Sequence, residues 1–210
     1  MYCFNADGAD HGDYDKFGAK VLHKNIHYVN AWIDRDFFES AIEGVFGGAP
    51  DIIFAFPPCT DLAVSGAAHF ELKRKSDPDF QVNAVKTCRV AQWLANAFEV
   101  PYMIENPVSV LSTMWRRPDH TFHPYEFGGF MAEDDRHPFF PEIIRPRDAY
   151  PKKTCLWVGG GFVMPSVNPV APPLGYSDQH NRLGGKSSRT KTIRSLTPRG
   201  FARAVFEANK

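Results

Sequence analysis

The sequence predicts an α/β fold, in which a mainly parallel sheet carries helices on both faces and the second half of the chain is rich in loops. Two short apolar runs, 51–56 and 100–104, are too short and too rich in β-branched or aromatic residues for helices. Between them, residues 80–98 carry apolar residues at helical spacing. The 17 prolines and 16 glycines, many of them after residue 115, indicate the loops.

The first half of the chain alternates strands with helical segments. In order, we expect a strand over 2–6 that ends at Asp7-Gly8, a loop over 8–20, a weaker strand over 27–33 that ends at Asp34, a helix over 36–46 and the strand over 51–56. The helix shows an apolar stripe, and Gly47-Gly48 stops it. This order of elements is typical of a parallel sheet.

The remaining elements are more widely spaced. We expect a loop or short helix over 60–75, the helix over 80–98, the strand over 100–104, a strand over 154–158 and a terminal helix that begins at Thr197-Pro198. Proline suits the first turn of a helix because its missing N–H has no helical partner there. With 210 residues, the chain is long enough for a single domain, 1–210, with a loop-rich insertion at about 109–150.

Composition excludes several classes of protein. Lys plus Arg and Asp plus Glu each total 24, so the whole chain has no net pull toward nucleic acid or membrane. The segment 182–203 is nevertheless basic and contains no acid. Four widely spaced cysteines without a CxxC motif argue against a metal site and indicate a reduced, cytoplasmic setting, and no apolar stretch is long enough to span a membrane.

Chemistry-bearing residues follow both apolar runs. Pro57-Pro58-Cys59-Thr60 comes directly after the first, and Glu105-Asn106-Pro107 directly after the second. Residues just past the strand ends of an open α/β sheet line its ligand crevice. We therefore expect the Cys59 thiol, a strong nucleophile when ionised, and the Glu105 carboxyl to face one pocket. Such a pair suits covalent attack on an electron-poor ring.

These two motifs, in this order and at this separation, resemble the catalytic motifs of DNA cytosine-5 methyltransferases. The chain is most similar to small phage and prophage members of that family. The similarity extends from about residue 50 onward and includes four further segments: Ile104-Glu-Asn-Pro-Val108, Phe122-His-Pro-Tyr-Glu-Phe-Gly128, Lys152-Lys-Thr-Cys-Leu-Trp157 and Thr197-Pro-Arg-Gly-Phe-Ala202. The combination is more specific than any one segment.

The resemblance implies a Rossmann-like methyltransferase fold and a covalent mechanism. Cys59 attacks C6 of cytosine, Glu105 hydrogen-bonds or protonates N3, and C5 takes a methyl group from S-adenosylmethionine. Pro58 shapes the catalytic loop together with Pro57, and Asn106 supports Glu105. In duplex DNA the target base is flipped into the pocket. Lys153 and Thr154 stand where the family has a basic motif that contacts the base or its phosphate.

The cofactor half departs from the family pattern, because no glycine-rich turn follows the first strand. Either residues 1–7 match the second strand of the family and the first is absent, or they are a degenerate first strand and Asp34 binds the ribose. The cofactor candidates are therefore Asn5, Asp7, Asp34 and Pro57. If the turn is missing, a partner chain completes the cofactor site or the protein is inactive.

Three functions remain open from the sequence. The first is methylation of cytosine in duplex DNA in a bacterial host cell, with Lys186 and Arg189 of the basic stretch on the phosphates. The second keeps this chemistry on a nucleotide or a single strand. The third is an inactive, nucleic-acid-binding relative. The histidines at 120, 123 and 137 fit no metal spacing, so they are expected to be surface or packing residues.

Overall fold

The computed structural model describes residues 1–5, 25–172, 177–184 and 187–210. The described chain falls into two compact units. Unit 1 comprises Met1–Pro118 and Leu156–Gly161, and unit 2 comprises Asp119–Cys155 and Phe162–Lys210. The single domain expected over 1–210 stays a prediction.

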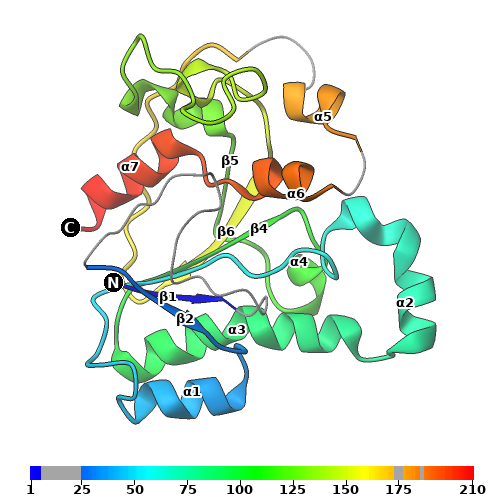
Figure 1. Ribbon diagram of the computed structural model, residues 1–210. Helices are drawn as coiled ribbons and strands as arrows, with labels where there is room; N and C mark the ends of the chain where they lie inside the picture. The colour runs from blue at the N-terminus through cyan, green and yellow to red at the C-terminus, as the bar shows by residue number, and fades with distance from the viewer. Residues whose placement is uncertain (6–24, 173–176, 185–186) are drawn as a thin grey trace. The chain divides into compact units, whose positions relative to one another are not determined.

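Unit 1 contains most of the strands and the longest helix (Figure 1). Its elements are the strands β1 (Tyr2–Asn5), β2 (His27–Asn30), β3 (Ile53–Ala55) and β4 (Tyr102–Pro107), the helices α1 (Arg35–Ile42), α2 (Phe70–Ser76), α3 (Phe80–Phe98) and α4 (Leu111–Met114), and the 3₁₀ helix η1 (Val64–His69). Strand β6 (Thr154–Gly159) begins in unit 2 and ends in unit 1. The expected helix over 80–98 is confirmed at both ends, and Glu99 after it adopts the left-handed conformation, φ 57°, that often ends a helix.

The strands form two sheets. β1 and β2 are parallel and make a two-stranded sheet. The second sheet has the order β3-β4-β6-β5, where β5 is His120–Phe122. In it β3 and β4 are parallel, with Ile53, Phe54 and Ala55 opposite Tyr102, Met103 and Ile104. The other pairings in this sheet are antiparallel.

The α/β class is therefore confirmed, but the expected mainly parallel, Rossmann-like sheet is wrong. A parallel strand after β4 needs a long crossover, usually a helix. The chain after β4 instead forms the four-residue helix α4, and β6 then runs antiparallel. The fold departs from expectation because the segment after β4 is too rich in proline, glycine and short turns to build a crossover helix.

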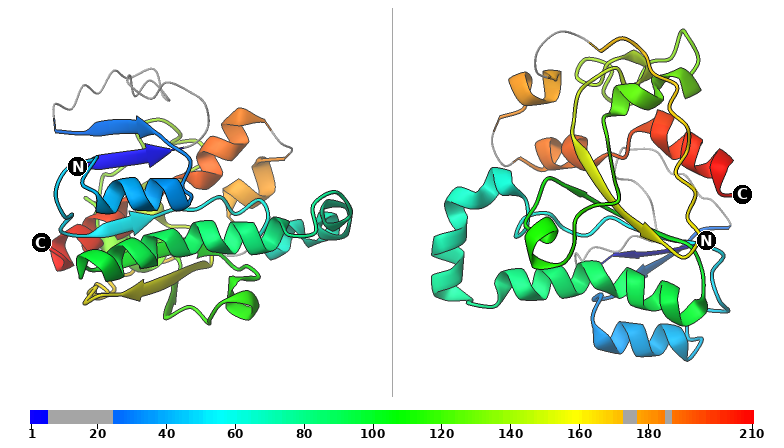
Figure 2. Two further views of the ribbon diagram at one scale, coloured as in Figure 1. Left: turned by 90° about the horizontal axis from the view of Figure 1, so that it is seen from below. Right: turned by 180° about the vertical axis from the view of Figure 1, so that it is seen from behind.

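The core of unit 1 joins both sheets through two helices. Phe37 of α1 and Val90 and Leu94 of α3 are its buried members. Phe4 of β1 and Ile53 of β3 pack against them. Helix α1 lies beside α3, and α3 also contacts β3 and β4 (Figure 2). Phe4 and Ile53 therefore lie on the buried faces of β1 and β3.

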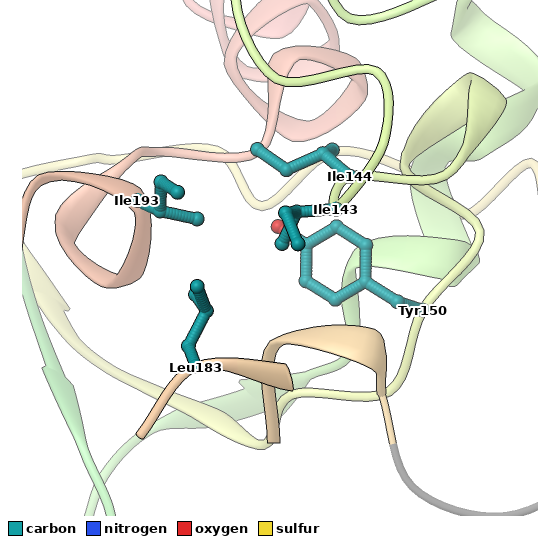
Figure 3. Packing of buried hydrophobic residues seen from close by; sticks show 5 residues of the cluster. All are labelled: Ile143, Ile144, Tyr150, Leu183 and Ile193. Atoms are coloured by element: carbon teal, nitrogen blue, oxygen red, sulfur yellow. The ribbon is translucent and has the colours of Figure 1, made fainter. Parts of the chain in front are cut away.

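Unit 2 is built from short elements around two apolar clusters. Its elements are β5, the start of β6, the 3₁₀ helices η2 (Pro124–Phe130) and η3 (Pro146–Asp148), and the helices α5 (Asp178–Arg182), α6 (Ser188–Ser195) and α7 (Arg199–Ala208). One cluster gathers the buried side chains of Ile143, Ile144, Tyr150, Leu183 and Ile193 (Figure 3). In the other, the ring of Phe201 in α7 stacks on Phe122 at 4.1 Å between centroids. The expected loop-rich character of the second half is confirmed.

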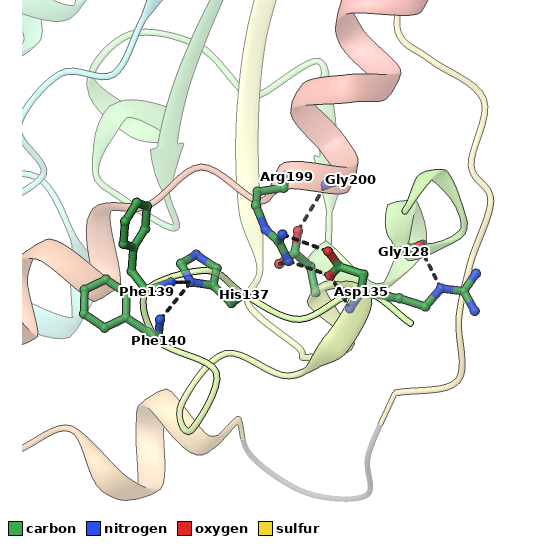
Figure 4. A network of polar contacts seen from close by, with 9 residues as sticks. Gly128, Asp135, His137, Phe139, Phe140, Arg199 and Gly200 are labelled. Atoms are coloured by element: carbon green, nitrogen blue, oxygen red, sulfur yellow. Dashed lines mark hydrogen bonds and ion pairs between the residues drawn. The ribbon is translucent and has the colours of Figure 1, made fainter. Parts of the chain in front are cut away.

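A polar network ties α7 to η3 within unit 2 (Figure 4). The guanidinium of Arg199 donates to both carboxylate oxygens of Asp135, at 2.9 and 2.6 Å. Asp148 is buried and accepts the N–H of Gly200 at 3.1 Å. A side chain at Gly200 would lie 2.3 Å from the carbonyl oxygen of Phe127, so only glycine permits this close packing of α7. Within the described residues, no helix is both long and apolar enough to cross a bilayer.

Candidate functional site

The two sequence motifs leave neighbouring strands at the same edge of the sheet. Because β3 and β4 are parallel and Ala55 lies opposite Ile104, the register carries Phe56 to Glu105 and Pro57 to Asn106. Glu105 and Asn106 belong to the end of β4 itself, which extends three residues beyond the predicted end at residue 104. Glu105 is half-buried and Asn106 is fully buried. The Pro-Pro-Cys turn therefore starts beside the strand that carries the carboxyl group.

Asn106 joins the two strand ends directly. Its side-chain Nδ2 donates to the carbonyl oxygen of Pro57 at 3.2 Å. The Asn106 side chain is 0% exposed, and its Oδ1 has no hydrogen-bond partner among the described residues. Loss of the bond to Pro57 would leave a second polar atom of this buried amide without a partner, which is costly. Asn106 therefore anchors the base of the turn that carries Cys59.

Cys59 lies at an exposed, tightly hydrogen-bonded turn. Its carbonyl oxygen accepts the N–H groups of Leu62 and Ala63, at 3.1 and 2.8 Å. Ala63 then forms an antiparallel bridge with Ser109, just after β4. The chain thus returns to β4 four residues after the cysteine, which holds the turn against the strand end on its far side as well.

The other three cysteines are less suited to nucleophilic chemistry. Cys88 and Cys155 are buried, and Cys3 is partly buried. Burial raises the pKa of the Cys88 thiol to about 12, which keeps it protonated. Burial also raises the pKa of Cys3, against the lowering effect of the N-terminal charge. Cys59 is the exposed one of the four, as a nucleophile requires.

A further set of side chains holds the turn, and sequence reasoning missed it. Lys73 of α2 donates from Nζ to the carbonyl oxygen of Thr60 at 3.0 Å and pairs with Asp61 Oδ1 at 2.5 Å. Gln81 of α3 donates to the carbonyl oxygen of Asp61 at 3.4 Å. In the sequence, the Lys-Arg-Lys run of α2 has the pattern of a solvated helix face, so it gave no signal of these contacts.

The cofactor candidates lie at the ends of β1, β2 and β3. Asn5 ends β1 and is exposed. Asp34 follows β2 and caps α1, since its Oδ1 accepts the N–H of Phe37 at 3.0 Å. Pro57 follows β3, whereas Asp7 lies outside the described residues. Sequence reasoning did not single out Trp32, whose indole is 77% exposed just after β2.

The predicted substrate residues belong to unit 2. Lys153 is exposed. Thr154 is buried in β6, and its hydroxyl donates to the carbonyl oxygen of Lys152 at 3.2 Å, so its placement does not favour a substrate contact. Arg189 pairs with Glu142 at 2.5 Å, and Lys186 lies outside the described residues. Their roles in binding stay predictions.

In unit 1, the exposed Cys59 follows β3, and the half-buried Glu105 lies in the paired strand β4 beside the buried Asn106. Among the described residues, no three histidine, cysteine or acidic side chains are placed to hold a metal ion. The exposed thiol and the half-buried carboxyl offer nucleophilic and acid–base chemistry. Comparison of the chain with models of protein families, with curated proteins and with solved structures finds no match.

Proposed function

We propose that the protein is a DNA (cytosine-5) methyltransferase that transfers a methyl group from S-adenosylmethionine to C5 of cytosine through a covalent Cys59 adduct. One observation carries the proposal: the parallel pairing of β3 and β4 brings the Pro-Pro-Cys turn and Glu105 to one sheet edge, joined by the Asn106–Pro57 hydrogen bond. A covalent mechanism on a pyrimidine needs a nucleophile on the ring carbon and a proton donor on the ring nitrogen at the same time.

In the proposed reaction, the Cys59 thiolate adds to C6 and the electron pair of the C5–C6 double bond makes C5 nucleophilic. S-adenosylmethionine, when bound, supplies the methyl group that C5 receives and departs as S-adenosylhomocysteine. The C5 proton is then lost to solvent, and its electron pair re-forms the double bond as the C6–sulfur bond breaks. Cys59 thus leaves as the thiolate with which it began.

Glu105 controls the charge on the ring. As the sulfur adds, negative charge develops at N3 and the neighbouring carbonyl oxygen, and a carboxyl proton shared with N3 neutralises it. A half-buried carboxyl is suited to this role, because a proton donor is more effective where water is partly excluded. When the adduct collapses, the proton returns to Glu105.

The side chains near the ends of β1 and β2 include groups suited to bind S-adenosylmethionine. Asn5 and the second oxygen of Asp34 are suited to ribose hydroxyls, and the Trp32 ring is suited to stack on a purine. The support for a partner chain comes from β3, which among the described strands stands at the end of the four-strand order, with Phe54 in it and Phe56 just after it exposed. Such an edge can accept a further strand, and a strand supplied by a partner would place its own residues beside Pro57.

Flipped cytosine in duplex DNA is the proposed substrate, with Lys153 and Arg189 as contacts to the phosphate backbone. Both are exposed cations, which suits this role. The insertion at 109–150 contributes few long elements, so we expect the recognised sequence to be short. Cytosine in a nucleotide or a single strand is the alternative substrate.

Transfer of tritium from labelled S-adenosylmethionine tests the proposal. The intact chain should label cytosine in duplex DNA, and Cys59→Ala should reduce the rate by at least about a thousandfold while the fold remains. Cys3→Ala is the matched control and should keep its rate. Labelling of free dCMP but not of duplex would favour the nucleotide substrate. DNA binding without any transfer would contradict the proposal and favour an inactive relative.

A further inference from the structure

We propose that Lys73 is a positioning residue for the Cys59 thiol. The inference deepens the proposed function and rests on it for the role of the sulfur in turnover. Lys73 touches neither the sulfur's predicted target nor the strand ends, and it acts through the backbone that follows Cys59. The Lys73 ammonium group donates to acceptors in two consecutive residues. These are the carbonyl oxygen of Thr60, at 3.0 Å, and the carboxylate of Asp61, at 2.5 Å.

The contacts of Lys73 differ from those of an ordinary surface ion pair. Its side chain is 33% exposed, and its ammonium lies 5.9 Å from the centre of the Phe80 ring. On the same helix, Lys75 pairs with Glu71 one turn away at 3.4 Å, with both side chains largely exposed. Lys75 joins α2 to itself, whereas Lys73 joins α2 to the Cys59 turn. The two lysines therefore form a natural comparison of a structural clamp and a solvated pair.

A second side chain reinforces the same segment. Gln81, which is buried at the start of α3, donates to the carbonyl oxygen of Asp61 at 3.4 Å. Arg74 in turn donates to Gln81 Oε1 at 3.1 Å, which orients the amide. Residues from both α2 and α3 thus hold the two carbonyl groups that follow the cysteine. Such buttressing of a reactive residue by a second layer of contacts reduces the range of positions that it samples.

The clamp acts on a very short span of chain. On one side of Cys59, Asn106 holds the carbonyl oxygen of Pro57, and on the other side Lys73 holds that of Thr60. Between these points lie Pro58, whose ring fixes φ, and Cys59 itself. Loss of either anchor widens the range of positions that the turn samples, although its other hydrogen bonds remain. Because attack on a ring carbon requires close alignment of the sulfur, loss of the Lys73 anchor should slow covalent steps more than it weakens binding.

Alkylation of Cys59 tests the positioning role without any need for methyl transfer. In a Cys3→Ser background, the two remaining other cysteines are buried, so iodoacetamide reports on Cys59. Lys73→Met should slow alkylation and kcat for methyl transfer by roughly tenfold and leave KM for DNA within about twofold. Lys73→Arg should restore both rates, since its fork of donors can reach the same two oxygens. Lys75→Met, the matched control, should behave as the parent.

The outcomes separate this inference from the proposed function. If the parent chain shows no methyl transfer but Lys73→Met still slows alkylation and Lys73→Arg restores it, the positioning role holds and the methyltransferase proposal fails. Equal alkylation rates in Lys73→Met and Lys75→Met, at unchanged melting temperature, would overturn the positioning role. A fall in melting temperature that Lys73→Arg does not reverse, with alkylation unchanged below it, would likewise assign Lys73 to stability alone.

Discussion

Asn106, fully buried at the end of β4, donates a hydrogen bond to the carbonyl oxygen of Pro57, 49 residues earlier in the chain. This contact joins the strand that carries Glu105 to the turn that carries Cys59. An asparagine can make it because the amide nitrogen donates without adding a charge to the buried site. The same residue therefore links the stability of unit 1 to the geometry of the candidate site.

We expect Asn106→Ala to lower the free energy of unfolding by about 1–3 kcal/mol, because it leaves the Pro57 carbonyl without its donor and opens a small cavity. Urea unfolding gives this number. Asn106→Asp should cost more than the alanine variant at neutral pH, since it buries a charge and replaces the donor with an acceptor. An aspartate variant as stable as the parent would contradict the burial argument.

Glu105→Gln should reduce the rate of the chemical step by roughly a hundredfold or more, while DNA affinity changes little. Glutamine keeps the shape of the side chain but cannot supply the proton that N3 requires. Single-turnover methyl transfer with saturating DNA measures the chemical step, and filter binding measures affinity. Losses of equal size in both would argue against an acid role and favour a contact made equally before and during the reaction.

Arg199→Met should destabilise unit 2 by about 1.5–3 kcal/mol, because it leaves the partly buried Asp135 carboxylate without its ion-pair partner. Burial raises the pKa of Asp148, whereas the Gly200 N–H and the positive charge of Arg199 lower it. Arg199→Met would remove this nearby positive charge as well. The control is Arg203→Met, which removes an exposed pair with Glu207 on the same helix and should cost less than about 0.5 kcal/mol. Similar losses in the two variants, measured by urea unfolding, would refute the network's importance.

The free energy of unfolding should fall as the pH drops below 6.5, which is the ordinary pKa of histidine. Burial, together with the Arg199 charge, lowers the pKa of His137 despite the opposing carboxylates of Asp135 and Glu142. The unfolded chain therefore takes up a proton before the folded one does, so acid favours unfolding. In the fold, His137 Nδ1 accepts the N–H groups of Phe139 and Phe140, which a protonated ring cannot do (Figure 4).

His137→Asn provides the measurement for this pH dependence. The asparagine Oδ1 can accept the same N–H groups but does not titrate. The melting temperature, measured from pH 7.5 to below the ordinary pKa of histidine, should change less steeply with pH in this variant than in the parent. Parallel curves for the two proteins would assign the acid sensitivity to other groups, such as Asp135. The pKa of that carboxyl is lowered, since its bonds with Arg199 and Arg147 outweigh its burial.

DNA affinity should decrease as salt increases if the basic stretch 182–203 contacts phosphates. Arg199 and Arg203 already pair with acidic side chains, and Arg189 would have to exchange its pairing with Glu142 for the proposed phosphate contact. Lys191 is exposed, so Lys191→Ala should reduce the slope of log affinity against log salt by about 1. Arg203→Ala is the control with an intact slope, and a flat salt response in the parent would remove this part of the substrate proposal.

Local pattern was sufficient to locate the helix over 80–98, the two strands that end in Cys59 and Glu105 motifs, and the loop-rich second half. Apolar periodicity and turn residues act over a few neighbouring positions, so they can be read without knowledge of the fold. The antiparallel directions of the strands after β4 could not be read in this way. The proline and glycine content after β4 disfavours a crossover helix, but which strand each later segment pairs with is decided by packing.

The sequence by itself therefore determined which residue types end the two strands, and with them the chemistry that the site can perform. Only the tertiary structure decided that β3 and β4 pair in parallel, that Asn106 reaches Pro57, and that Lys73 reaches Thr60. These contacts join residues 13 to 49 positions apart, and a side chain's distant partner follows from how helices and strands pack. The physical reason is that hydrogen-bond partners are chosen by position in space, whereas periodicity reports only whether a residue faces the core or the solvent.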